Sequence, residues 1–222
     1  MMKLTKKRVV LFLLFIFPLI CFLLMSTGTN NFTKLPVATT NVVDISTIDA
    51  AKTFKDNISV VCFLGDDMNA HKGGFFNLNE KIYKKFIEYN KFQIIAIYPE
   101  GKEEEAKQLK KEISAFTDMV KWNFIPGSKE DISALHASFN SSYPLSSSSY
   151  TFKTFLVDKN GDLRGRADDK ENPNREILGY DMNSVADLNK IMKDDILVLF
   201  YEYYAAFKEK NENKAQRKEV GL

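Results

Sequence analysis

One short polar segment holds the residues whose types and spacing could do chemistry. Within six residues, directly after an apolar run, it contains Asp66, Asp67, Met68 and His71. The thioether of Met68 and the imidazole of His71 would suit copper. The segment therefore predicts a candidate copper site with these two side chains as metal ligands. The alternative is that the paired aspartates cap a helix or form a solvated turn.

The sequence contains two cysteines, Cys21 and Cys62. A cysteine nucleophile must be a partly exposed thiolate in electropositive surroundings. Cys62 has apolar neighbours inside a predicted buried strand, which favours a packing role, and a thiol oxidoreductase working from Cys62 is the alternative. Cys21 lies in a second apolar run that we expect to be embedded in lipid. A disulfide between the two cysteines is therefore not expected.

Other classes of activity lack their motifs. The sequence has neither the G-x-S-x-G nucleophile motif nor the G-x-x-x-x-G-K-[ST] phosphate-binding motif. Lys and Arg number 31 against 29 Asp and Glu, and the two signs are interleaved, which excludes a basic nucleic-acid footprint. We expect no enzymatic activity, no nucleic-acid partner and no cofactor other than copper. His136 is expected to be a partly buried helix residue.

The elements around the polar segment predict where it lies. Residues 58–64 are a largely apolar run without alternation, which is typical of a strand covered on both faces. A loop with the glycine pair 73–74 is expected next, followed by an amphipathic helix over 79–89. In an α/β sheet, sites usually lie beyond the carboxyl ends of the central strands. The polar segment has that position.

The rest of the chain predicts an α/β sandwich of the thioredoxin type, with a mixed central sheet flanked by helices. A hairpin turn is expected at 158–161, where Asn-Gly favours positive φ. A faint first strand is expected near 35–43. The further predicted strands are 92–98, 121–125, 150–157 and 163–166, and the further helices begin at Glu103, Ser128 and Asn183 or Ser184.

The N-terminal sequence predicts a membrane anchor. Basic residues within 1–8 precede an uncharged apolar run over 9–25, which is at the short end of what can span a bilayer as a helix. Positive charge before the run keeps the N-terminus in the cytoplasm. We therefore expect a single-pass membrane protein whose C-terminal domain is exported. The expected parts are a cytoplasmic basic segment 1–8, a transmembrane signal-anchor 9–25, a tether 26–43, a thioredoxin-like domain 44–210 and a polar tail 211–222. A cleaved signal peptide and a lipoprotein signal are alternatives.

Three stretches between about residues 44 and 208 carry a family resemblance. They read VVCFLGDDMNAHKGG, WNFIPGSKEDISALHASF and TFKTFLVDKNGDLRGR. The chain resembles the Sco/SenC branch of the thioredoxin superfamily, membrane-anchored proteins associated with copper delivery to cytochrome oxidase. By position, the two copper-binding cysteines of that family correspond to Met68 and Lys72, its histidine to Tyr150 and the superfamily's cis-proline to Phe152. The resemblance therefore implies a degenerate member, Cys-less in this loop, that keeps the fold without the redox motif. It also implies an anchor in the bacterial inner membrane and a C-terminal domain in the periplasm.

These observations predict a binding role for the domain. We expect a docking edge formed by 66–76 and 146–150, which bind an envelope or respiratory-complex protein. The mixed-charge loop with Asp168, Asp169 and Glu171 next to Arg164, Arg166, Lys170 and Arg175 is either a solvated exposed loop or a second candidate docking surface. The candidate partner-binding residues of the docking edge are Asp66, Asp67, Phe75, Phe76 and Tyr150.

Overall fold

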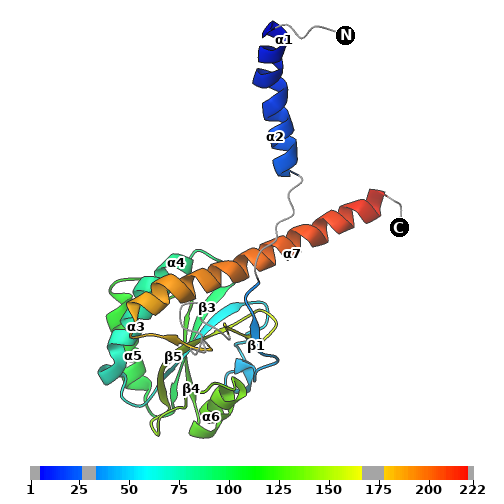
Figure 1. Cartoon of the computed structure of the whole chain (residues 1–222). Helices are drawn as coiled ribbons and strands as arrows, with labels where there is room; N and C mark the ends of the chain where they lie inside the picture. Colours follow the sequence, from blue (N-terminus) through cyan, green and yellow to red (C-terminus); the bar gives the residue numbers. More distant parts are fainter. Residues whose placement is uncertain (1–5, 27–33, 167–177, 220–222) are drawn as a thin grey trace. The chain divides into compact units, whose positions relative to one another are not determined.

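The computed structural model describes residues 6–26, 34–166 and 178–219 (Figure 1). The chain divides into two compact units, Met1–Thr33 and Lys34–Leu222. The loop residues Asp168, Asp169, Lys170, Glu171 and Arg175 lie outside the described residues.

The first unit contains three consecutive helical segments. These are α1 (Lys6–Leu11), the π-helical η1 (Phe12–Ile16) and α2 (Phe17–Ser26). In the described part of the chain, no helix combines the length and the apolar character needed to cross a membrane. The membrane-spanning helix over 9–25 thus stays a sequence-based prediction.

A mixed sheet forms the centre of the second unit. Its strands are β1 (Val37–Thr39), β2 (Ile58–Leu64), β3 (Phe92–Pro99), β4 (Trp122–Gly127), β5 (Tyr150–Val157), β6 (Leu163–Arg164) and β7 (Tyr180–Asp181). The order across the sheet is β1-β6-β5-β2-β3-β4, and β7 pairs with β5. β2, β3 and β4 are parallel, whereas β5 is antiparallel to β2 and to β6. This order, two parallel crossovers followed by a hairpin, fits the predicted thioredoxin-like fold.

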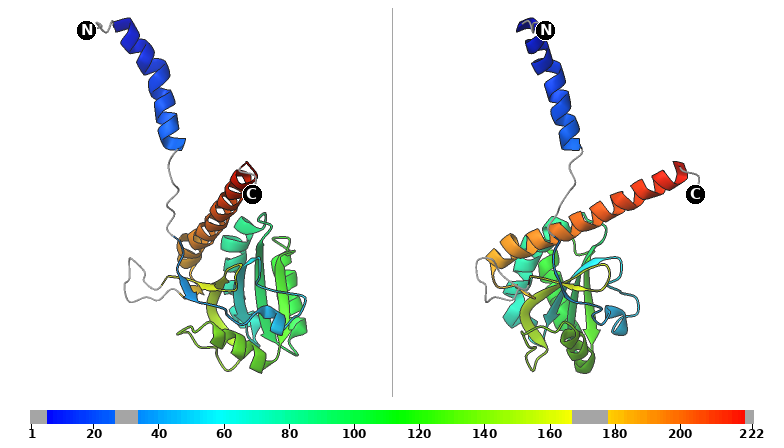
Figure 2. Two further views of the ribbon diagram at one scale, coloured as in Figure 1. Left: turned by 90° about the vertical axis from the view of Figure 1, so that its right-hand side faces the viewer. Right: turned by 45° about the vertical axis from the view of Figure 1, so that its right-hand side comes forward.

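Helices cover both faces of the sheet (Figure 2). On one face lie α3 (Met68–Leu78), η3 (Asn79–Tyr83), α4 (Lys84–Phe86), α5 (Glu103–Ser114), η4 (Asp187–Met192) and α7 (Lys193–Glu219). On the other face lie η2 (Ile45–Thr47) and α6 (Lys129–Ser138). β2 contributes alternate side chains to the two cores, Cys62 to the first and Phe63 to the second. The prediction of a strand covered on both faces is therefore confirmed.

The prediction of a loop over the glycine pair 73–74 is wrong. These two residues are helical, because α3 already begins at Met68. The Asp67 carboxylate caps this helix by accepting a hydrogen bond from the Ala70 backbone N–H at 3.0 Å. A Cβ added to Gly74 would lie 3.1 Å from the Met182 Cβ, so glycine lets α3 approach the segment before η4 closely. The pair is therefore part of a packed helix.

Both ends of the second unit differ from the expected domain limits 44–210. The unit begins at Lys34, because β1 pairs with β6 within the stretch expected as a tether. α7 continues to Glu219, through most of the stretch expected as a polar tail. The composition of that stretch explains the helix, since Lys, Glu, Gln, Arg and Ala all favour helical backbone.

Candidate functional site

The residue that follows β2 lies very close to the first residue of β5. Gly65 has φ 72°, and a Cβ added there would lie 2.6 Å from the Cβ of Tyr150. Leu64 pairs with Tyr150 across the β2–β5 ladder. The polar segment 66–71 is thereby brought beside the first residue of β5, as the predicted docking edge requires.

Two acidic side chains and a lysine lie at this edge. Asp66 is half-buried, whereas Asp67 is exposed and caps α3. The hydrogen bond from Lys102 to Glu105, 2.7 Å long, raises the pKa of Lys102, and the negative charges of Asp66 and Asp67 raise it further. The sequence reading missed Lys102, which precedes α5 and lies near the aspartates only because β2 and β3 are adjacent parallel strands.

Met68 and Phe75 lie inside the core. The side chain of Met68 is 1% exposed and that of Phe75 is fully buried. They lie seven residues apart on α3, so both occupy its inner face. The expectation that Phe75 contacts a partner is therefore wrong. An ion could reach the sulfur of Met68 only if core side chains moved.

An aromatic pair extends this edge toward α5. Phe76 is half-buried and makes an edge-to-face contact with Phe116, with 6.0 Å between the ring centroids. The helix that begins at Glu103 ends at Ser114, and the Phe116 side chain that follows it is 64% exposed. Phe116 is thus an exposed aromatic residue next to the half-buried Phe76.

His71 stacks on Tyr150. The two rings are nearly parallel, at 6°, with centroids 3.6 Å apart. Burial raises the pKa of Tyr150, and a hydrogen bond with the Asn183 side chain acts against this shift. Tyr150 also packs against the core from its partly buried position. The stack therefore presents a flat, half-buried aromatic surface beyond the end of β2.

The positions that would carry copper in the Sco/SenC branch hold other groups. Met68 is buried, Lys72 pairs with Glu112 at 3.3 Å, and Tyr150 is stacked on His71. An ammonium group and a phenol do not replace a thiolate and an imidazole as copper ligands. Within 6–26, 34–166 and 178–219, no group of three or more His, Cys, Asp or Glu side chains could hold a metal ion. The side chains at these three positions do not fit the family's copper site.

Cys62 lies in the core. Its side chain is fully buried, its Sγ lies 3.7 Å from the Ile95 carbonyl oxygen, and burial raises the pKa of its thiol. A raised pKa disfavours the thiolate that nucleophilic chemistry needs. The packing role is thus confirmed, and the geometry argues against an oxidoreductase working from Cys62.

His136 lies on the opposite face of the sheet from Met68. The His136 side chain is 8% exposed and makes edge-to-face contacts with Phe63 and Phe155, at centroid distances of 5.2 and 5.6 Å. Burial lowers the pKa of the imidazole. His136 is a helix residue as expected, and its side chain is buried rather than partly buried.

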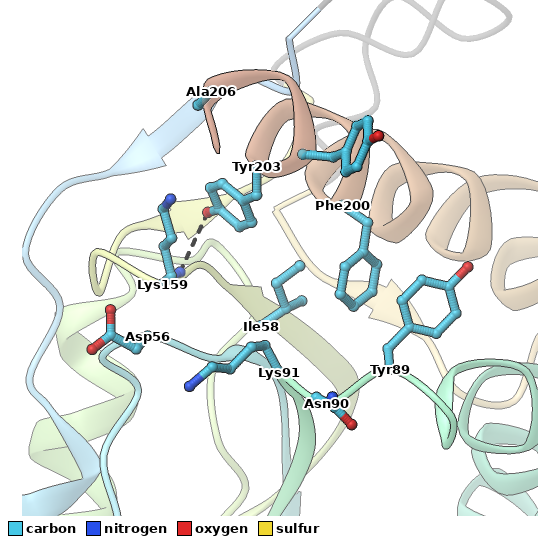
Figure 3. A pocket seen from close by; sticks show the side chains of 10 residues that line it. Asp56, Ile58, Tyr89, Asn90, Lys91, Lys159, Phe200, Tyr203 and Ala206 are labelled. Carbon is cyan, nitrogen blue, oxygen red and sulfur yellow. Dashed lines mark hydrogen bonds between the residues drawn. The ribbon is translucent and has the colours of Figure 1, made fainter. Parts of the chain in front are cut away.

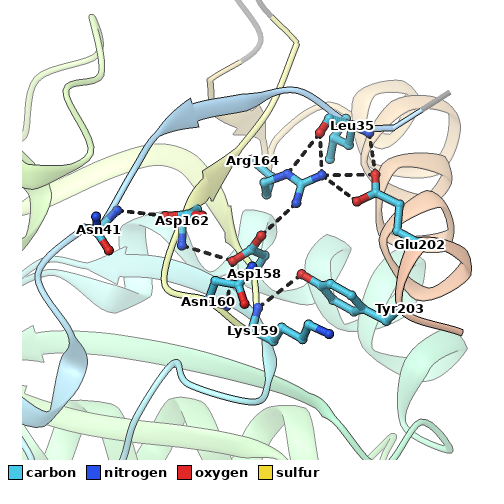
Figure 4. A network of polar contacts seen from close by, with 9 residues as sticks. All are labelled: Leu35, Asn41, Asp158, Lys159, Asn160, Asp162, Arg164, Glu202 and Tyr203. Atoms are coloured by element: carbon cyan, nitrogen blue, oxygen red, sulfur yellow. Dashed lines mark hydrogen bonds and ion pairs between the residues drawn. The ribbon is translucent and has the colours of Figure 1, made fainter. Parts of the chain in front are cut away.

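The arginines of the second candidate docking surface are structural. Arg164 is buried and pairs with Asp158 at 2.7 Å and with Glu202 at 2.8 Å (Figure 4). Arg166 forms an ion pair with the buried carboxylate of Asp195. Both arginines therefore connect the hairpin to α7. Arg164 is therefore not part of an exposed mixed-charge surface, whereas the Arg166 side chain is 40% exposed.

No protein-family model and no curated protein matches the chain. Solved structures to which it is similar include a candidate protein disulfide isomerase from Bacteroides thetaiotaomicron, with 12% identity, coverage of 79% of this chain and 94% of that chain, and a TM-score of 0.46. Copper-bound ScoI from Arabidopsis thaliana has 13% identity, 64% and 85% coverage and a TM-score of 0.42. A thiol:disulfide interchange protein from Bacteroides sp. has 18% identity, 60% and 79% coverage and a TM-score of 0.36. At these identities and TM-scores the similarities assign neither a function nor a family, and the thioredoxin-like fold rests on the strand order.

Proposed function

We propose that this chain is a non-catalytic thioredoxin-like domain that binds another protein of the cell envelope. It would be a Cys-less relative of the Sco/SenC branch with an assembly role, for example in the biogenesis of a respiratory complex. The proposed contact surface consists of Asp66, Asp67, His71, Phe76 and Tyr150, and we call it the rim. The stack of His71 on Tyr150 carries the proposal, because it puts a flat aromatic surface at the position where relatives in that branch place metal ligands.

The chemistry of the rim suits a protein partner. Tyrosine is enriched among the residues that contribute most to binding energy, because it offers a large contact area with few rotatable bonds. The acidic Asp66 and Asp67 beside the stack would steer a basic partner segment and fix its register. The exposed Phe116, in contact with Phe76, extends the apolar part of the surface.

We further infer that residues 9–25 hold the chain at the bacterial inner membrane, with the thioredoxin-like unit in the periplasm. The large apolar side chains of this run support the inference, since those of Leu14, Phe15 and Met25 are 65%, 65% and 84% exposed. An exposed apolar surface of this kind needs a lipid or protein cover. Alkaline-carbonate extraction tests the inference: the full chain should stay with the membrane pellet, and release into the supernatant would contradict the anchor.

Affinity purification of the full chain tests the binding role. The tagged protein is recovered from detergent-solubilised envelopes as the wild type, as the rim variant Asp66→Lys/His71→Ala, and as the control variant Glu104→Lys/Lys107→Ala. The control changes exposed side chains on α5, which are 89% and 77% exposed, and leaves the rim intact. The wild type and the control should enrich the same partner, and the rim variant should lose it. Equal recovery by all three proteins, or no specific partner with any of them, would overturn the proposal.

A further inference from the structure

A second concave surface lies at the other end of the central strands. Its cavity is about 600 Å³ and is lined at its base by Ile58, the first residue of β2. The turn before β3 forms one wall through Tyr89, and α7 forms another (Figure 3). We call it the aromatic groove. Its volume is in the range that small-molecule sites usually occupy, roughly 300–1,000 Å³.

Aromatic side chains form the walls of the aromatic groove. The rings of Tyr89 and Phe200 lie 4.3 Å apart between centroids, at 39° to each other. Phe200 also stacks on Phe86 beneath it, at 5.9 Å and 21°, so its ring is held in place from below. Tyr204 on α7 also lines the groove, and its side chain is 70% exposed. The groove therefore offers an apolar ligand one aromatic ring that is held in place, Phe200, and one that is accessible, Tyr204.

Two lysines give the aromatic groove a positive side. Its lining contains Lys91 and Lys159 against one carboxylate, that of Asp56. The Lys159 ammonium lies 4.0 Å from the centroid of the Tyr203 ring. The Lys159 backbone N–H donates to the Tyr203 hydroxyl at 3.3 Å, and its carbonyl accepts from the Asp56 N–H at 2.9 Å. The first bond fixes the backbone of the hairpin turn against α7, and the second fixes it against the segment before β2. The side chain of Lys159 is therefore attached to a rigid backbone.

We propose that the aromatic groove binds a small apolar carboxylate, whose apolar body lies against Tyr89, Phe200 and Tyr204 and whose carboxylate faces Lys91 and Lys159. The apolar body would exclude water from the aromatic walls. The two ammonium groups would select an anion over a neutral molecule of the same shape. This site is separate from the rim, so it stands or fails independently of the proposed binding role.

Photolabelling of the full chain in a neutral detergent tests the site. The probe is 4-benzoylbenzoate, its neutral twin is 4-benzoylbenzamide, and labelled peptides are mapped by mass spectrometry. The carboxylate should label peptides containing Tyr89 or Phe200–Tyr204, and excess 2-naphthoate should abolish this labelling. Labelling by the amide should be at least about fivefold weaker, as the loss of two exposed charge interactions implies.

Matched lysine variants separate the site from general electrostatics. Lys91→Gln/Lys159→Gln should lower labelling of these peptides by about fivefold to tenfold, whereas Lys55→Gln/Lys111→Gln, which removes two lysines that do not line the groove, should leave it unchanged. Tyr204→Ser should weaken labelling at the same place without unfolding the protein, since that side chain is mostly exposed. Equal labelling by acid and amide, labelling confined to 9–25, or equal loss in both lysine variants would overturn the proposal.

Discussion

The guanidinium of Arg164 lies 2.7 Å from the carboxylate of Asp158, and the two side chains are 7% and 0% exposed. The same guanidinium also donates to Glu202 on α7 and to the Leu35 carbonyl oxygen that precedes β1. One buried cation thus joins the hairpin, the last helix and the first strand. Burial of a charge is tolerated when it is paired and hydrogen-bonded in this way.

Removing this cation should strongly destabilise the domain. Arg164→Met leaves Asp158 buried without its partner, and such a loss typically costs about 3–5 kcal/mol. Urea unfolding of the full chain measures the change in the free energy of unfolding. Lys107→Met is the control, because it removes a pair in which both side chains are highly exposed, and it should not shift the midpoint measurably. A similar midpoint for Arg164→Met and the wild type would show that the pair does not hold the hairpin to α7.

Two glycines near the rim should respond in opposite directions to alanine. Gly65→Ala should destabilise the protein by at least about 1–2 kcal/mol, because its φ of 72° is unfavourable for alanine and the new Cβ would lie 2.6 Å from the Tyr150 Cβ. Gly73→Ala should stabilise it by about 0.5–1 kcal/mol, since the position is helical and no heavy atom lies within 4 Å of the added Cβ. Thermal unfolding of both variants checks the signs. A destabilised Gly73→Ala variant would contradict the placement of α3.

Cys62 should be inert in the native protein. Its burial and the raised pKa of its thiol both oppose reaction with a maleimide. In a Cys21→Ser background, mass spectrometry should detect no labelling under native conditions and complete labelling in denaturant. Rapid native labelling would revive the oxidoreductase alternative.

Acidification should destabilise the domain through His136. Because burial holds the folded-state pKa of this imidazole below 6.5, the unfolded chain takes up its proton first as the pH falls. The stability associated with neutral His136 is fully present above about pH 6.5 and is lost as the pH falls toward the folded-state pKa. Urea midpoints measured between pH 7.5 and pH 5 should fall less steeply in His136→Gln than in the wild type. Parallel pH dependences would show that His136 does not contribute to this loss.

Much of the fold follows from the sequence pattern, because strand burial and capping are local signals. The largely apolar run of β2 predicted its central place, and Ser128 caps α6 as expected, accepting from the Asp131 N–H at 3.0 Å. The sequence did not predict the start of α3 at Met68, because a Gly pair favours a loop. The packing of Met182 against Gly74, which explains the glycine, is not visible in the sequence. Contacts between distant segments carry no local signal.

The sequence predicted where the candidate site lies, but not which side chains contact one another there. The close approach of Gly65 to Tyr150 confirms that segment 66–71 lies beside the start of β5. The stack of His71 on Tyr150 depends on a pairing of β2 with β5 that joins residues far apart in sequence. Arg164 appeared to belong to a solvated charged loop, since nothing near it in the sequence indicates Glu202 as its partner.

Site-specific photo-crosslinking in intact cells tests the central proposal most directly. A photo-reactive phenylalanine analogue replaces His71 in the rim in one variant and Lys107 on the exposed face of α5 in another. The proposed binding role predicts a discrete adduct of defined mass from position 71, identified as an envelope protein, and none from position 107. No adduct from position 71, or the same set of adducts from both positions, would contradict a binding role for the rim.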